Sequence, residues 1–145
     1  MSKLEIRPIT DEDVAATIDL WKRCELTMPH NDPHKDIAFA RAGLASDVLG
    51  GFYDGKLVAS VMVGHDGHRG SLYYVSTDPG VRGMGLGAAI VEAAEDWLRQ
   101  RGVWKLNVMV RKTNLSAKGF YESIGYGDDP VVTVSKRLDE NEGQS

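Results

Sequence analysis

The 145-residue sequence has little of several features that mark specialised classes of protein. Cys24 is its single cysteine, so a disulfide bond within the chain is excluded. No apolar run approaches the ~20 residues that a membrane-spanning helix needs, and the N-terminus has no apolar core typical of a secretory signal. These absences predict a cytoplasmic protein with no membrane partner.

Positive charge is also scarce. Lys and Arg number 17 against 21 Asp and Glu, so the formal net charge is -4, and the basic residues form no dense run. Nucleic-acid-binding proteins gather basic residues on one face or along one helix. We therefore expect no nucleic-acid partner. The length predicts one domain over residues 1–138, followed by an acidic, apolar-poor tail at 139–145 that we expect to be disordered.

Apolar periodicity and turn residues predict a chain that mixes strands and helices. Asp54-Gly55 between two apolar runs is the strongest hairpin signal. Thr10 and Asp32 are typical helix N-caps, and Gly102 and Gly125 typical helix ends. We expect Trp97 and Trp104 in the core, strands over 4–9, 48–53, 57–63, 72–77, 105–110 and 131–135, and helices beginning near 14, 33, 85 and 114.

The stretch from Tyr74 to Ala89 is the most informative part of the sequence. It runs from a β-branched and aromatic strand through a glycine cluster into an amphipathic helix. Gly83, Gly85 and Gly87 carry no Cβ, so successive backbone N–H groups can approach a phosphate closely. The helix that follows adds its positive dipole end. This segment predicts a binding site for a pyrophosphate.

Two other phosphate-binding motifs must be weighed against this one. The segment Gly83–Ala88 also fits the dinucleotide fingerprint, which calls for an acidic residue about 20 positions further on to bind a ribose. Lys105, Leu106 and Asn107 stand there instead, and too little sequence remains for two nucleotide-binding halves. The Walker motif needs Gly-Lys-Ser or Gly-Lys-Thr, and neither occurs. Nucleotide hydrolysis is therefore unsupported.

Two segments stand in a fixed order, joined by an expected helix and strand. They are Arg82-Gly-Met-Gly85-Leu-Gly87 and Asn114-Leu-Ser-Ala117-Lys-Gly-Phe-Tyr121-Glu-Ser-Ile-Gly125-Tyr126. In order and spacing they resemble the R/Q-x-x-G-x-G/A and N-x-x-A-x-x-x-Y-x-x-x-G-F/Y signatures of the GNAT superfamily of N-acetyltransferases. Further segments look like the bacterial YpeA-type members: Trp21-Lys-Arg-Cys24-Glu-Leu, Asn31-Asp-Pro33 and Asp66-Gly-His-Arg-Gly70.

The resemblance implies a fold and an activity. The fold would be a single α/β domain of the α+β type, with a mixed, mostly antiparallel central sheet flanked by helices. The activity would be acetyl-CoA-dependent N-acetyl transfer, with acetyl-CoA as co-substrate and without a metal. The acceptor would be an amine of a small molecule or a protein, and a homodimer would be common for this family. The rivals are a catalytically silent acyl-CoA sensor that uses the same cleft and a purely structural interaction domain.

The resemblance also implies roles for residues at matched positions. Backbone groups of Val75 and Thr77 would pair with the pantetheine arm in the manner of an added strand. Tyr121 would be the general acid for the leaving thiolate. Asn114 and Ala117 would contact the cofactor arm; a core aromatic at Tyr121 and a simple helix cap at Asn114 are the structural alternatives. The pyrophosphate would lie on the backbone amides of Arg82, Gly83, Met84, Gly85, Leu86, Gly87 and Ala88.

The general base is where the sequence departs from the family. Ser71 and Met109 stand at the positions where some members carry a catalytic glutamate, and neither is a plausible base. The amine would then lose its proton to ordered water or to a nearby side chain. The candidates are His65, Asp66 and His68, although the sequence around all three is typical of a solvated turn.

Overall fold

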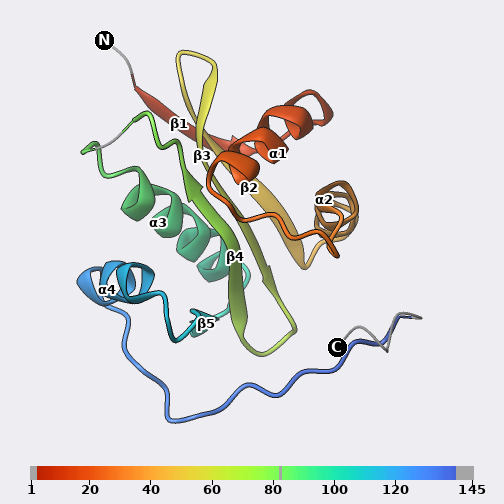
Figure 1. Ribbon diagram of the computed structural model, residues 1–145, viewed down its shortest axis with the longest axis vertical. Helices are drawn as coiled ribbons and strands as arrows, with labels where there is room; N and C mark the ends of the chain where they lie inside the picture. The colour runs from red at the N-terminus through yellow and green to blue at the C-terminus, as the bar shows by residue number, and fades with distance from the viewer. Residues whose placement is uncertain (1–2, 82, 140–145) are drawn as a thin grey trace. The chain divides into compact units, whose positions relative to one another are not determined.

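The computed structural model of the chain describes residues 3–81 and 83–139 (Figure 1). Its internal contacts divide the chain into two compact units, Met1–Met109 and Val110–Ser145, which are described one after the other. The predicted pyrophosphate-binding residue Arg82 and the predicted disorder at 140–145 lie outside the described residues. A single domain over 1–138 stays a prediction.

The first unit contains a five-stranded sheet in the order β1-β2-β3-β4-β5. The first three pairings are antiparallel, and only β4 and β5 run parallel. This confirms the prediction of a mixed, mostly antiparallel sheet. Asp54 and Gly55 form the turn between β2 and β3 with φ values of 50° and 81°, as a two-residue hairpin turn requires. The strands are β1 Leu4–Pro8, β2 Ser46–Tyr53, β3 Lys56–His65, β4 Gly70–Thr77 and β5 Leu106–Val108.

The described residues of this unit form three α-helices: α1 Val14–Arg23, α2 Pro33–Arg41 and α3 Leu86–Arg99. A short 3-10 helix precedes α1, and there the Asp13 carboxylate accepts the Thr10 N–H at 2.8 Å. At the start of α2 the Asp32 carboxylate accepts the His34 N–H at 2.9 Å. Both caps stand where the sequence predicts them. After α3, Gly102 is left-handed, with φ of 84°, and donates its N–H to the Arg99 carbonyl at 3.0 Å.

Helices cover both faces of the sheet. Consecutive residues of β3 from Leu57 to Val61 are buried, and since side chains alternate along a strand, both faces must be covered. α3 packs against β2, β3 and β4. On the face of α1 and α2 one apolar cluster contains Ile9, Ile18, Trp21, Ile37, Ala40 and Val48, with Val14, Leu26, Met62 and Tyr74 packed against it.

Trp97, within α3, and Trp104, after it, differ in burial. Trp97 lies in the core with 8% of its surface exposed, as predicted. The prediction for Trp104 is wrong, because 76% of its surface is exposed. Trp104 lies between the end of α3 and the start of β5, and the Arg69 guanidinium covers its ring at 4.4 Å from the centroid. A cation–π contact at the surface thus takes the place of burial in the core.

The second unit holds α4, Leu115–Ser123. Gly125 ends it with φ of 102°, and the Tyr126 N–H donates to the Tyr121 carbonyl at 3.0 Å, so the predicted left-handed cap is present. The predicted strand over 131–135 is wrong, because this segment forms no strand (Figure 1). Valine-rich alternation favours a strand only where a neighbour completes the hydrogen bonds, and the exposed fractions of Val131, Val132 and Val134 are 74%, 86% and 89%.

Candidate functional site

The site begins at an open edge of β4. β5 pairs with β4 only through residues Gly70–Leu72. Beyond that point, within the part of the chain that the structure describes, no strand pairs with β4 on its β5 side, while β3 continues on the other side. The segment from Tyr73 to Thr77 is therefore an edge on which an extended ligand can add as a strand.

Val75 and Thr77 direct their backbone groups to this edge. The Asp78 N–H donates to the Val58 carbonyl on β3 at 2.8 Å, and Ser76 lies opposite Ser60. Because backbone groups alternate in direction along a strand, those of Val75 and Thr77 face away from β3. The carbonyl of Thr77 already accepts a hydrogen bond from the Cys24 thiol at 3.1 Å, which leaves its N–H for a ligand.

A bulge distorts β4 within the same segment. Tyr73 lies opposite Met62 and Ser76 opposite Ser60, so two residues of β4 face one residue of β3. The extra residue is Tyr74, whose φ is 55°, a value that bulky side chains rarely adopt. The sequence gives no signal for this bulge, because tyrosine and valine at 73–75 fit a regular strand equally well.

The glycine segment after β4 forms an open turn before α3. Gly83 and Gly85 are exposed and left-handed, with φ of 73° and 68°, and nothing lies within 4 Å of the position that a Cβ would take. Gly85 is the N-cap of α3, and the first hydrogen bond within the helix runs from the Ala89 N–H to the Gly85 carbonyl. The N–H groups that precede this bond have no partner within the helix: those of Leu86, Gly87 and Ala88.

This geometry suits a phosphate. Left-handed residues interspersed in a turn gather neighbouring N–H groups into a concave anion site. The N-terminus of α3 adds its positive end, and the exposed Met84 completes the predicted segment, with 54% of its surface accessible.

A buried carboxylate fixes the turn that leads into the glycine segment. Asp78 is only 4% exposed and accepts the Gly80 N–H at 2.8 Å and the Arg23 guanidinium at 2.9 Å. These two partners, the Gly80 amide foremost, hold the pKa of Asp78 below its usual range. The Val81 N–H closes the turn on the Asp78 carbonyl. Sequence analysis missed this role, although Asp-Pro-Gly is a typical turn signal that could have indicated it.

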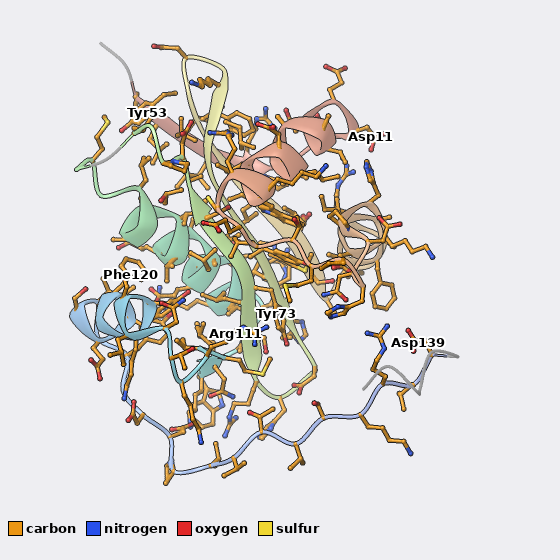
Figure 2. The ribbon with its side chains drawn as sticks, viewed as in Figure 1. Asp11, Tyr53, Tyr73, Arg111, Phe120 and Asp139 are labelled. Carbon is orange, nitrogen blue, oxygen red and sulfur yellow. The ribbon has the colours of Figure 1, made fainter. Side chains whose placement is uncertain are left out.

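Asn114, Ala117 and Tyr121 all belong to α4 in the second unit. The Asn114 side chain accepts the Ala117 N–H at 3.0 Å, so its capping role is present. Tyr121 is half-buried, and its ring meets those of Phe120 and Tyr126 edge-on at centroid distances of 5.1 Å and 5.5 Å; Figure 2 labels Phe120 on this helix. Burial raises the pKa of the Tyr121 phenol, which keeps it protonated at neutral pH.

Of the three candidate bases, His65 is the last residue of β3, and Asp66 and His68 lie in the turn between β3 and β4. His65 Nδ1 accepts the Gly67 N–H at 3.0 Å, and Asp66 accepts the N–H groups of His68 and Arg69. These backbone bonds, that of Arg69 first, lower the pKa of Asp66, which makes it a weaker base. The side chains of His65 and Asp66 thus act as turn residues.

In the two described ranges, no cluster of His, Cys, Asp or Glu could hold a metal ion.

A cavity of about 440 Å³ lies where α1 approaches the segment that leads into α2. Its polar lining side chains include Lys22, Asn31 and His34. The remaining lining residues are Ile18, Thr27, Met28, Pro29 and Pro33.

None of the helices described here is long and apolar enough to cross a membrane.

Known proteins share this sequence pattern and this fold. The model of the acetyltransferase (GNAT) family matches residues 11–126. An acetyltransferase of Pectobacterium atrosepticum is 40% identical over 138 residues, which is 95% of this chain and 98% of that protein. The structure of AAC(6')-Iy in complex with the bisubstrate analogue CoA-S-monomethyl-acetylneamine has a TM-score of 0.80 at 15% identity, covering 94% of this chain and 100% of the other.

A further solved structure is a predicted acetyltransferase of Clostridium acetobutylicum with acetyl-CoA. Its TM-score is 0.75 at 14% identity, covering 92% of this chain and 96% of the other. At such identities the two solved structures support the fold alone.

Proposed function

Because this chain belongs to the GNAT family and is an acetyltransferase, we propose that it transfers the acetyl group of acetyl-CoA to a primary amine by direct attack. The observation that carries this proposal is the open edge of β4, which leads straight into the glycine turn at the N-terminus of α3. One continuous stretch of backbone thus offers strand-type hydrogen bonds and then an anion site.

Two parts of acetyl-CoA, the pantetheine arm and the pyrophosphate, have matching backbone groups on this stretch. The amides of the pantetheine arm would pair with the backbone of Val75 and with the Thr77 N–H at the open edge. The pyrophosphate would receive the N–H groups at the start of α3 and those of the left-handed glycines. Asn114 and Ala117 would contact the arm from α4, and the backbone amide of Arg82 would join the groups that receive the pyrophosphate.

The chemistry needs no covalent intermediate on the enzyme. A neutral amine attacks the thioester carbonyl, and the negative charge that develops on its oxygen is stabilised by a backbone N–H at the β4 edge, for which Val75 is the candidate. The tetrahedral intermediate then expels coenzyme A as the C–S bond breaks. Tyr121 would donate a hydrogen bond or its proton to the departing sulfur. Its raised pKa favours the hydrogen bond, because a phenol is then a weaker acid than a thiol.

The acceptor would enter from the side of α1 and α2. The cavity there has polar groups at Lys22, Asn31 and His34, which could contact polar groups of an amine substrate. The acceptor is an amine of a small molecule or of a protein. Because His65 and Asp66 are engaged in hydrogen bonds of a turn, we propose that ordered water accepts the proton of the amine.

We also propose a cytoplasmic location, where the single thiol of Cys24 stays reduced, and a homodimer as in many family members.

The deciding experiment is a screen of primary amines, including amino acids, amino sugars and protein N-terminal peptides, with acetyl-CoA and detection of free coenzyme A. We expect turnover with at least one class of amine. Binding of acetyl-CoA without turnover on any amine would favour the rival function, a silent acyl-CoA sensor. Absence of acetyl-CoA binding would contradict both.

A further inference from the structure

Tyr74 is a strained residue in the middle of the proposed cofactor edge. Its φ of 55° places a bulky aromatic residue in the left-handed region, at the bulge where β4 and β3 change register. Strain of this kind persists only where the surrounding structure over-determines it, and it gathers at functional sites. The contacts that hold Tyr74 therefore show what maintains the bulge.

Two side chains from the covering helices hold Tyr74 in place. Its ring stacks on that of Trp21 from α1, with centroids 3.9 Å apart and planes inclined by 3°. Trp21 is fully buried, and its indole N–H donates to the Ser60 hydroxyl at 3.4 Å, on the β3 residue just beyond the bulge. The Tyr74 hydroxyl donates to the Asp36 carboxylate of α2 at 2.7 Å. The bulge is thereby tied to both helices.

The bond to Asp36 is well suited to fix a geometry. A hydrogen bond to a carboxylate is shorter and stronger than one between neutral groups. Burial and the neighbouring Asp36 raise the pKa of the Tyr74 hydroxyl well above its ordinary value, so it stays protonated and always acts as the donor. Asp36 itself is half-buried on the first turn of α2, a helix held by its Asp32 cap.

We propose that Asp36 is a positioning residue: through the Tyr74 hydroxyl its carboxylate holds the β4 bulge in the form in which the Val75 N–H meets the thioester carbonyl of acetyl-CoA. This inference rests on the proposed function, because it assumes that the acetyl end of the co-substrate lies at the bulge. Asp36 acts indirectly, because Tyr74 and the backbone of β4 lie between its carboxylate and the ligand.

A positioning role for Asp36 predicts different effects on two ligands, which a merely structural role does not. Coenzyme A lacks the thioester carbonyl but shares the pantetheine arm and the pyrophosphate with acetyl-CoA. Loss of the hydrogen bond between Tyr74 and Asp36 should therefore weaken acetyl-CoA binding and leave coenzyme A binding nearly unchanged. One misplaced backbone hydrogen bond corresponds to a change of roughly 3- to 10-fold in affinity.

The test measures the dissociation constants of acetyl-CoA and coenzyme A by calorimetry for the unaltered protein, Tyr74→Phe and Asp36→Asn. Tyr74→Phe keeps the stacking on Trp21 and removes only the hydroxyl. Asp36→Asn keeps the side-chain volume and removes the charge. If Tyr74→Phe fails to fold, the comparison is made with Asp36→Asn alone. Asp11→Asn is the matched control, since this carboxylate, labelled in Figure 2, is 96% exposed and contacts Arg41 of α2 at 2.9 Å, outside the β4 edge.

We expect both variants to lose preference for acetyl-CoA over coenzyme A by roughly 3- to 10-fold, and Asp11→Asn to keep it. Equal weakening of both ligands, or no change in the preference, would overturn the positioning role and leave the proposed function standing. Failure of the unaltered protein to bind either ligand would overturn the proposed function, and the positioning role with it.

Discussion

Replacement of Asp78 by asparagine is expected to destabilise the fold, because this carboxylate is buried with a charged partner. It accepts the Gly80 N–H at 2.8 Å and the Arg23 guanidinium at 2.9 Å. Charged hydrogen bonds of this kind contribute about 1.5–3 kcal/mol each. The Arg23 side chain is 41% exposed and can return to water in the variant, so the contribution of that bond must be discounted. We expect a loss of about 2 kcal/mol in the free energy of unfolding.

The loss should be visible in thermal and urea unfolding. For a chain of this length, about 2 kcal/mol corresponds to a fall of roughly 4–10 °C in Tm. Asp19→Asn is a matched control, because Asp19 also contacts Arg23, at 2.9 Å, but its side chain is 66% exposed. An exposed pair contributes about 0–1 kcal/mol, so the control should change Tm little. If Asp78→Asn is no less stable than this control, the buried carboxylate does not stabilise the fold as expected.

The loss of stability caused by Asp78→Asn should also depend on pH, and it should become smaller as the pH falls. The pKa of Asp78 is lower in the folded protein than in the unfolded chain, so its stabilisation is present above the unfolded pKa and is lost as pH falls through the folded pKa. The difference in unfolding free energy between the unaltered protein and Asp78→Asn should therefore hold at neutral pH and shrink below about pH 4. A difference that stays constant into acid would contradict the role of the charge.

Three further predictions concern the proposed site. Gly85→Val should fold but weaken acetyl-CoA binding in calorimetry, since valine at φ of 68° is strained and distorts the amides at the start of α3; unchanged affinity would rule out the anion site. Acetyl-CoA should raise the unfolding free energy by about 2.7 kcal/mol at a hundred times its Kd, and NAD and ATP should cause no thermal shift; a shift with NAD would instead support the dinucleotide alternative. Tyr121→Phe should keep acetyl-CoA affinity and lower kcat at least about tenfold on an amine found by the screen, with loss of the alkaline limb of the pH profile. An unaltered kcat and profile would leave Tyr121 as a packing residue.

Features decided by a few neighbouring residues could be predicted from the sequence. The caps at Thr10 and Asp32, the Asp54-Gly55 turn and the left-handed Gly125 all stand where expected, because each depends on local backbone geometry. The glycine turn before α3 is of the same kind. Its conformation was predictable, and the binding of a pyrophosphate there stays a prediction.

Features that depend on distant residues could not be predicted. Asp78 and Arg23 are 55 positions apart in the sequence, and Tyr74 and Asp36 are 38 apart. No local sequence pattern therefore predicts either contact. The error over 131–135 has a related cause: the valines have the right alternation, but a strand also needs a neighbour. Trp104 shows that a large aromatic side chain can be satisfied by a surface cation instead of the core.

The bulge in β4 also bears on how the protein avoids aggregation. An edge that accepts an extended ligand could equally template the strand of a neighbouring molecule, and long flat edges are the usual starting points of such association. Among the described residues, the free edge of β4 runs from Tyr73 to Thr77 and is bent at Tyr74. A rigid strand would lose register at the bend, because a bulge sharpens the local twist. A thin, flexible ligand can follow the bend, so the same distortion favours a small molecule over another polypeptide chain.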